Sequence, residues 1–118
     1  MRDIMVVDTR NAGDAEARWS WRWDGALRCT AAMLIEERVR AECDRVRHGH
    51  AESRFFGELR DHGEAIADKL VAKALQAFAR NRLLLIVNDT QVIGPNTEIR
   101  LDEPIEATFV RLTPLQAG

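Results

Sequence analysis

Few residues in this sequence are of the types that do chemistry at neutral pH. His48 and His50 lie two residues apart, and His62 follows further along the chain. Two such histidines could begin a metal site, but no carboxylate or thiol cluster with the usual ligand spacing completes it. No pattern of a Ser/His/Asp or Cys/His nucleophile, a phosphate loop or paired carboxylates stands out. We therefore predict no catalytic residues, no cofactor and no metal site, and we do not expect an enzyme.

The two cysteines, Cys29 and Cys43, are too few for a disulfide framework and lack the spacing of metal ligands. We expect both to be small buried residues that stay reduced. The length of 118 residues fits one domain, and a formal net charge of −2 argues against a protein that covers nucleic-acid phosphates. No apolar run approaches the ~18 residues of a membrane span or forms a signal peptide, so we expect a cytoplasmic protein with no membrane or nucleic-acid partner.

Three tryptophans, Trp19, Trp21 and Trp23, alternate with Ser20 and Arg22. This period of two places the three indole rings on one face of a strand. One interpretation is a core face that packs on helices. The other is a partly exposed aromatic stripe that docks a partner, since tryptophan is favoured at interface anchors.

Longer elements must position these residues. A β-branched run predicts a strand over residues 3–9. Apolar residues at helical spacing predict a helix over 31–47, and Thr30 is suited to cap its first turn. A second helix is predicted over 63–80, after which Asn81 suits a left-handed stop.

The last third of the chain is predicted to form short strands. Residues 83–87 are five apolar residues in a row, which indicates a strand buried on both faces or central in a sheet. Asn88 and Asp89 tolerate a positive φ and suit a two-residue hairpin turn. Further strands are expected at 90–93, 97–101 and 105–112. Pro114 then ends the last strand because it cannot donate to a ladder.

The order of these elements and several short motifs resemble the ubiquitin-like β-grasp family. Residues 82–118 are similar to the C-terminal half of ubiquitin. They are more similar to two bacterial sulfur carriers, the small subunit of molybdopterin synthase and the thiamine sulfur carrier. The matching positions are Val87-Asn88, Asp102-Glu103, Pro114 to Gly118, and a Thr-led helix start at Thr30 to Leu34. The similarity covers about residues 30–46 and 82–118 and omits about 49–81. Ala117 departs from the pattern, because both relatives usually have glycine there.

The resemblance implies an α+β fold of the ubiquitin-like β-grasp type. Its mixed sheet would have about five strands, with a main helix and an inserted second helix. We expect a single domain over residues 1–112, a helical insertion at about 49–81, and a C-terminal tail at 113–118. Any docking surface would then be sought on the side of the sheet opposite the helices.

The resemblance also implies a function at the terminal carboxylate of Gly118. We expect an E1-like adenylating enzyme to use ATP to activate this carboxylate, and an E2-like protein and a processing peptidase to act as further partners. The carboxylate would then be conjugated to targets in a bacterial ubiquitination-like pathway. The enzyme is expected to recognise the tail residues before the glycine, which are Pro114, Leu115, Gln116 and Ala117. Six extended residues reach on the order of 20 Å, and glycine allows close backbone approach.

Two other functions remain open from the sequence. One is a sulfur carrier whose Gly118 becomes a thiocarboxylate. The other is a non-catalytic β-grasp interaction module that binds through Trp19, Trp21 and Trp23. Deletion of Gly118 is expected to abolish the two functions of the tail and to leave the third unchanged.

Overall fold

The computed structural model describes residues 2–10, 17–47 and 64–112, which form an α+β structure of two helices and seven strands. The elements follow the chain as β1 (Arg2–Arg10), β2 (Ala17–Trp23), β3 (Arg28–Thr30), α1 (Ala31–Arg47), α2 (Glu64–Ala79), β4 (Leu83–Val87), β5 (Thr90–Val92), β6 (Glu98–Arg100) and β7 (Ile105–Arg111). The predicted class, with a mixed five-stranded sheet and two helices, is confirmed.

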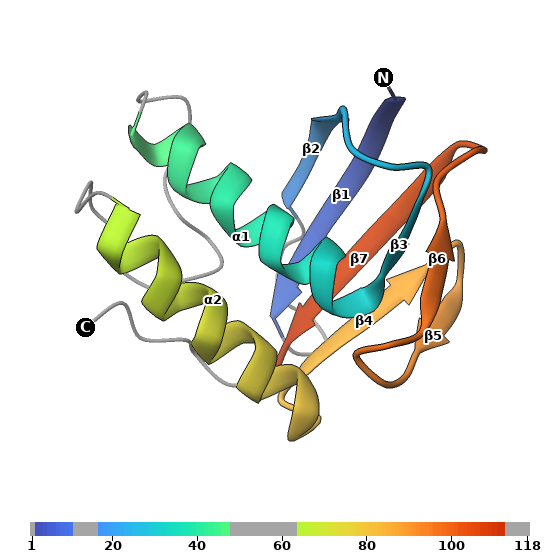
Figure 1. Ribbon diagram of the computed structural model, residues 1–118. Helices are drawn as coiled ribbons and strands as arrows, with labels where there is room; N and C mark the ends of the chain where they lie inside the picture. Colours follow the sequence, from blue (N-terminus) through green and yellow to red (C-terminus); the bar gives the residue numbers. More distant parts are fainter. Residues whose placement is uncertain (1, 11–16, 48–63, 113–118) are drawn as a thin grey trace.

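The five-stranded sheet has the order β2-β1-β7-β4-β5. β1 runs parallel to β7, and the other neighbouring pairs are antiparallel. Both helices lie over one face of this sheet, and the opposite face carries neither of them (Figure 1). β1 and β7, the first and last strands of the described residues, are therefore neighbours, and β7 is the central strand of the sheet.

The prediction for residues 83–87 holds for the strand but not for its place. β4 is one position from the centre of the sheet, between β7 and β5. Leu83 and Leu85 face the helices and are buried, whereas Leu84 and Ile86 are half-buried on the opposite face. Five apolar residues in a row therefore do not mean burial on both faces here.

The first turn of α1 is capped as the sequence predicts. The Met33 amide donates to Thr30 Oγ1 at 3.2 Å. The preceding amides of Ala31 and Ala32 donate to carbonyl oxygens of residues 97 and 95, each at 2.9 Å. Since the first amides of a helix lack intrahelical partners, these three bonds fix where α1 begins and tie it to the chain before β6.

Two predicted backbone reversals are confirmed by positive φ angles. Asn81 follows α2 with a φ of 58°, and the Arg82 amide returns to the Ala77 carbonyl oxygen at 2.8 Å. Asn88 and Asp89, at 48° and 69°, form the turn between β4 and β5. Asn88 also ties this turn to β7, because its Oδ1 accepts from the Glu106 amide at 2.9 Å.

The strand predicted at 97–101 forms as β6 but does not join the main sheet. It pairs antiparallel with β3 in a separate two-stranded sheet, with Cys29 opposite Ile99. The Leu101 amide extends this pairing by donating to the Leu27 carbonyl oxygen at 2.6 Å. β3 is only three residues long and was not predicted.

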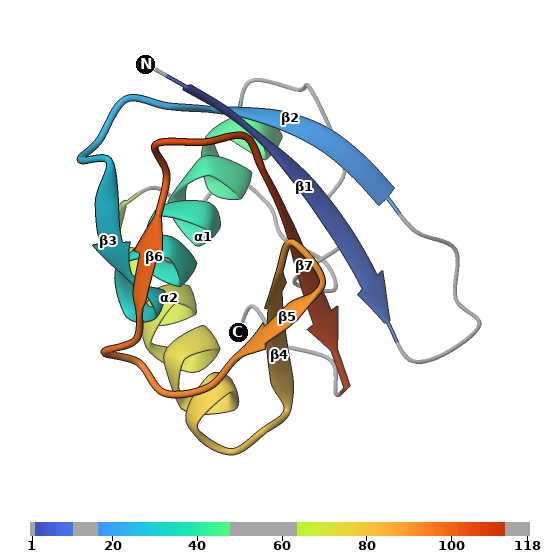
Figure 2. The same cartoon turned by 90° about the vertical axis from the view of Figure 1, so that its right-hand side faces the viewer.

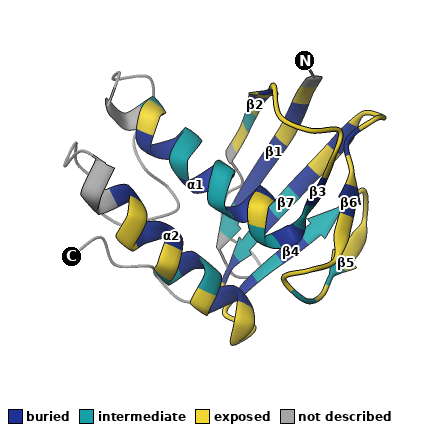
Figure 3. Cartoon of the chain, in the orientation of Figure 1, coloured by how far each residue is buried: buried dark blue, intermediate teal, exposed yellow. Residues whose placement is uncertain are grey.

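The buried residues of the core come from both the helices and the sheet, as the dark blue segments of Figure 3 show. β1, β7 and β4 contribute alternate residues, and α1 and α2 contribute residues at helical spacing. Cys29 and Cys43 are buried free thiols, as predicted. Burial raises the pKa of the Cys29 thiol to about 11, because the thiolate is poorly solvated there.

Candidate functional site

The residues predicted to act in the tail, Gly118 and the four residues 114–117, lie outside the described residues. The structure describes the strand that leads to them. The Leu112 amide donates to the Arg82 carbonyl oxygen at 2.8 Å, one residue after the end of β7. Leu112, the last described residue, therefore lies next to the start of β4, at the carboxyl end of the central strand.

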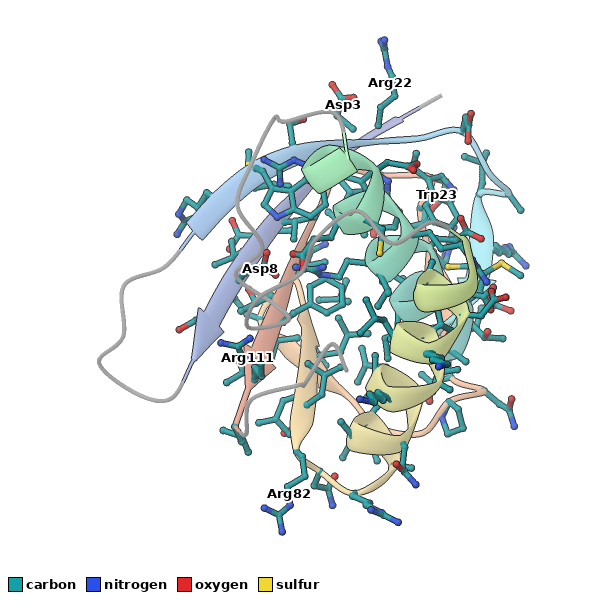
Figure 4. The ribbon with its side chains drawn as sticks, turned by 90° about the vertical axis from the view of Figure 1, so that its left-hand side faces the viewer. Asp3, Asp8, Arg22, Trp23, Arg82 and Arg111 are labelled. Carbon is teal, nitrogen blue, oxygen red and sulfur yellow. The ribbon has the colours of Figure 1, made fainter. Side chains whose placement is uncertain are left out.

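The interpretation of the tryptophans as an exposed partner face is wrong for two of the three. Trp21 and Trp23 are only 9% and 5% exposed and belong to the core cluster. Their rings meet edge to face at 5.3 Å, and Trp23 turns toward the body of the protein in Figure 4. The alternative core interpretation accounts for them, because the helices cover this face of β2. Trp19 also packs against the core but keeps an intermediate exposure.

Half-buried and exposed aliphatic side chains lie together on β4 and at the end of β7. We name this group the outer patch, and it consists of Leu84, Ile86, Val110 and Leu112. Leu84 lies directly opposite Val110 in the ladder between β4 and β7, and Ile86 lies opposite Thr108. Leu112 is 39% exposed, and the other three are intermediate. Because alternate residues of a strand share a face, the patch is continuous across the two strands.

A group of charged residues is buried on the covered side of the sheet. We name Asp8, Arg38 and Glu42 the buried ion cluster; their exposures are 6%, 0% and 4%. Arg38 Nη2 lies 2.6 Å from Asp8 Oδ2 and 3.0 Å from Glu42 Oε1. Trp19 Nε1 donates to the same Asp8 oxygen at 2.8 Å. β1, β2 and α1 are thus joined at one carboxylate.

Electrostatics in the buried ion cluster favour the charged arginine. Burial acts to lower the pKa of Arg38, but the charges of Glu42 and Asp8 and their hydrogen bonds outweigh it and raise that pKa above its usual value. The guanidinium carbon also lies 5.5 Å from the ring centre of Trp19 and 5.2 Å from that of Phe109. With so little exposure, the cluster is placed to hold elements together and not to meet a substrate.

The buried ion cluster was not predicted, although the sequence carries a signal for it. Arg38 and Glu42 lie four and eight residues after the buried Leu34, on the same stripe of α1 as the core residues. Asp8 continues the inward alternation of Ile4 and Val6 on β1. Three charged residues at core positions of two elements indicate that the elements meet through an ion pair, since unpaired charges are rarely buried.

Arg45 lies beside the exposed part of Trp19. Its guanidinium carbon is 4.2 Å from the centre of the Trp19 ring, so the indole lies near both Arg45 and Arg38. Burial lowers the pKa of Arg45, and the nearby positive charge of Arg38 acts in the same direction, against opposing effects of Glu42 and Asp8. The arrangement presents a half-buried cation at the side of β2.

Within residues 2–10, 17–47 and 64–112 no three potential ligands gather around a metal position, and no helix is both long and apolar enough to cross a membrane. His48, His50 and His62, which were not expected to form a metal site, lie outside these ranges. No protein-family model, curated protein or solved structure matches this chain.

Proposed function

We propose that this chain has a ubiquitin-like β-grasp fold and acts as a protein modifier. Its Gly118 carboxylate is adenylated by an E1-like enzyme and conjugated to targets in a bacterial ubiquitination-like pathway, with an E2-like protein as carrier. The chain itself is the substrate of these steps and not the enzyme.

The observation that supports this proposal is the order β2-β1-β7-β4-β5 with β1 and β7 parallel. An N-terminal hairpin, a helix across one face and a last strand inserted beside the first are the features of a β-grasp. α1 has the place of the main helix, and α2 is the additional one. β7 ends at Arg111, so the central strand of the sheet is the one that leads into residues 113–118.

The proposed chemistry needs only a carboxylate from this chain. The Gly118 carboxylate oxygen attacks the α-phosphorus of ATP, pyrophosphate leaves, and an acyl-adenylate forms. A cysteine thiolate of the enzyme then attacks the acyl carbon, AMP leaves, and a thioester results. Glycine at the end suits a narrow channel, because no side chain opposes close approach of the backbone.

The outer patch supplies a docking surface for the activating enzyme. It lies on the face without helices and includes Leu112, the last described residue before the tail. The exposed ion pair of Arg18 on β2 and Glu106 on β7, at 3.5 Å, adds charged groups to the surface of the sheet. An apolar centre within a polar rim is the usual organisation of a protein interface.

The experiment is an immunoblot and intact-mass measurement of the N-terminally tagged protein expressed in its native host. A ladder of larger species that disappears when Gly118 is deleted supports the modifier. An Arg80→Gln variant, at an exposed residue just after α2, serves as the control that keeps the ladder. A single species with one oxygen replaced by sulfur identifies a sulfur carrier instead. A chain that stays unmodified, or one that continues past Gly118 in its mature form, refutes both tail functions.

A further inference from the structure

β2 is the longer edge of the sheet and has one strand neighbour in the described part of the chain. It pairs with β1 from Arg2 opposite Trp23 to Asp8 opposite Ala17. It lies at the margin of the sheet in Figure 2. The other edge, β5, has three residues against the seven of β2. A long edge whose outward backbone groups lack ladder partners is a template for another strand.

Positive charge lines the outer face of this edge. Arg18, Ser20 and Arg22 alternate there and are exposed, and β2 itself contains no acidic residue. Arg18 pairs with Glu106 at 3.5 Å and Arg22 with Asp3 at 3.9 Å; Figure 4 shows Arg22 and Asp3 projecting from the body. Pairs this exposed contribute little and exchange readily for other carboxylates.

The other face of the same edge also presents a cation. Arg45 stacks at 4.2 Å on the half-exposed Trp19 of β2. No carboxylate of the described residues forms an ion pair with Arg45. A carboxylate brought to this side of β2 would therefore meet an arginine that burial has already stripped of part of its water.

We propose that the β2 edge binds an extended acidic segment of a partner protein, which adds to the sheet as a further strand. Main-chain hydrogen bonds to β2 provide the affinity. Acidic side chains on the outer face meet Arg18 and Arg22, and the opposite side of the segment packs beside Trp19 and places a carboxylate near Arg45. This function is independent of the tail.

Charge argues against a second copy of this chain as the occupant. Two β2 strands related by a two-fold axis at Ser20 would place Arg18 of one copy opposite Arg22 of the other. Like charges directly opposite in a ladder destabilise the pairing. An acidic strand turns the same positions into favourable pairs.

The binding test uses a fluorescein-labelled peptide of about nine residues, long enough to span the seven residues of β2. Glutamate and valine alternate in it, and one central valine is replaced by glutamate, so that the added strand carries carboxylates on both faces. Fluorescence anisotropy with the full chain is expected to show saturable binding that weakens with salt. The same peptide with lysine in place of glutamate is expected not to bind. Absence of binding by the glutamate peptide, or equal binding of both peptides, overturns the proposal.

Amide hydrogen exchange measured by NMR locates the peptide. Strand addition is expected to protect every second amide of β2 and to leave β5 unchanged, because only the outward amides gain a partner. Binding without this alternating protection overturns the proposal, as does protection that comes from dimers detected by sedimentation.

Charge variants test the assigned arginines. Arg18→Glu combined with Arg22→Glu is expected to weaken binding at least about tenfold, and Arg45→Gln to weaken it severalfold. Arg82→Glu, exposed and remote from β2 in Figure 4, is the matched control and is expected to change affinity less than about twofold. Equal losses in the control and the β2 variants would show general attraction and overturn the assignment.

Discussion

Removal of Arg38 is expected to be among the most destabilising single changes in this chain. Arg38→Met keeps a long side chain of similar shape but leaves Asp8 and Glu42 buried at 6% and 4% exposure without their shared cation. Breaking a buried pair by removing one partner costs about 3–5 kcal/mol. A domain of this size has about 5–15 kcal/mol of stability in total, so a large part of it would be lost.

A triple variant separates the charges from the packing. Arg38→Met with Glu42→Leu and Asp8→Asn removes all three charges, and the asparagine oxygen still accepts from Trp19 Nε1. Replacement of a buried ion cluster by packed uncharged groups is often neutral or stabilising. We therefore expect the triple variant to recover most of the stability that the single variant loses, to within about 1 kcal/mol of the unmodified chain.

The assay is urea unfolding followed by far-ultraviolet circular dichroism, because fluorescence would also report the altered surroundings of Trp19. The free energy of unfolding is compared among the parent chain, the single variant and the triple variant at equal slope m. A loss below about 1 kcal/mol for Arg38→Met would refute the reasoning. So would a triple variant as unstable as the single one, since packing and not charge would then explain the loss.

Three further predictions concern local structure. Gly25→Ala is expected to lower the melting temperature, because a Cβ there would lie 2.9 Å from the Trp23 ring, and calorimetry checks it. Thr30→Ala is expected to cost about 1 kcal/mol in urea unfolding through loss of the bond to the Met33 amide. The raised pKa of Cys29 means that the folded state binds the thiol proton more tightly than the unfolded state does. The free energy of unfolding is therefore expected to fall as the pH rises from 9.0 to about 11, and Cys29→Ala is expected to remove that fall.

Each of these three predictions has a control variant or a result that would contradict it. Ala26→Ser, exposed and adjacent to Gly25, is expected to leave the melting temperature unchanged. Thr90 is exposed and caps no helix, so Thr90→Ala is the control for Thr30→Ala. An equal loss in the free energy of unfolding for the two variants would contradict the capping argument. For Cys29, a free energy of unfolding with the same pH dependence in the alanine variant would assign the fall to another group.

The parts of the fold that the sequence could predict are those that local chemistry decides. Thr30 and the apolar stripe after it place α1 at its observed residues, and Asn88-Asp89 supplies the positive φ angles that a tight hairpin turn needs. β3 shows the opposite case. Three residues carry no period, and the strand exists because β6 approaches it from far along the chain.

The candidate site was predictable to a smaller degree. The alternation of residue types along β2 placed Trp21 and Trp23 on one face of the strand. It does not say whether helices cover that face, and their burial there is what makes these residues core and not a partner surface. The outer patch depends on the register between β4 and β7, which no single segment specifies. Gly118 was predicted from a resemblance, and the structure describes only the strand that leads to it.

Trp19 connects the interior of this protein with the proposed binding edge. Its indole nitrogen donates to Asp8, and its ring lies near both Arg38 and Arg45. Arg38 is fully buried between two carboxylates, whereas Arg45 pairs with none of the described ones, so the first cation fixes the ring and the second is available to a ligand. A site that recognises a carboxylate needs a cation in a fixed position, since otherwise binding must also order the side chain. The buried ion cluster thus positions Trp19, and Arg45 lies against this positioned ring at the proposed binding edge.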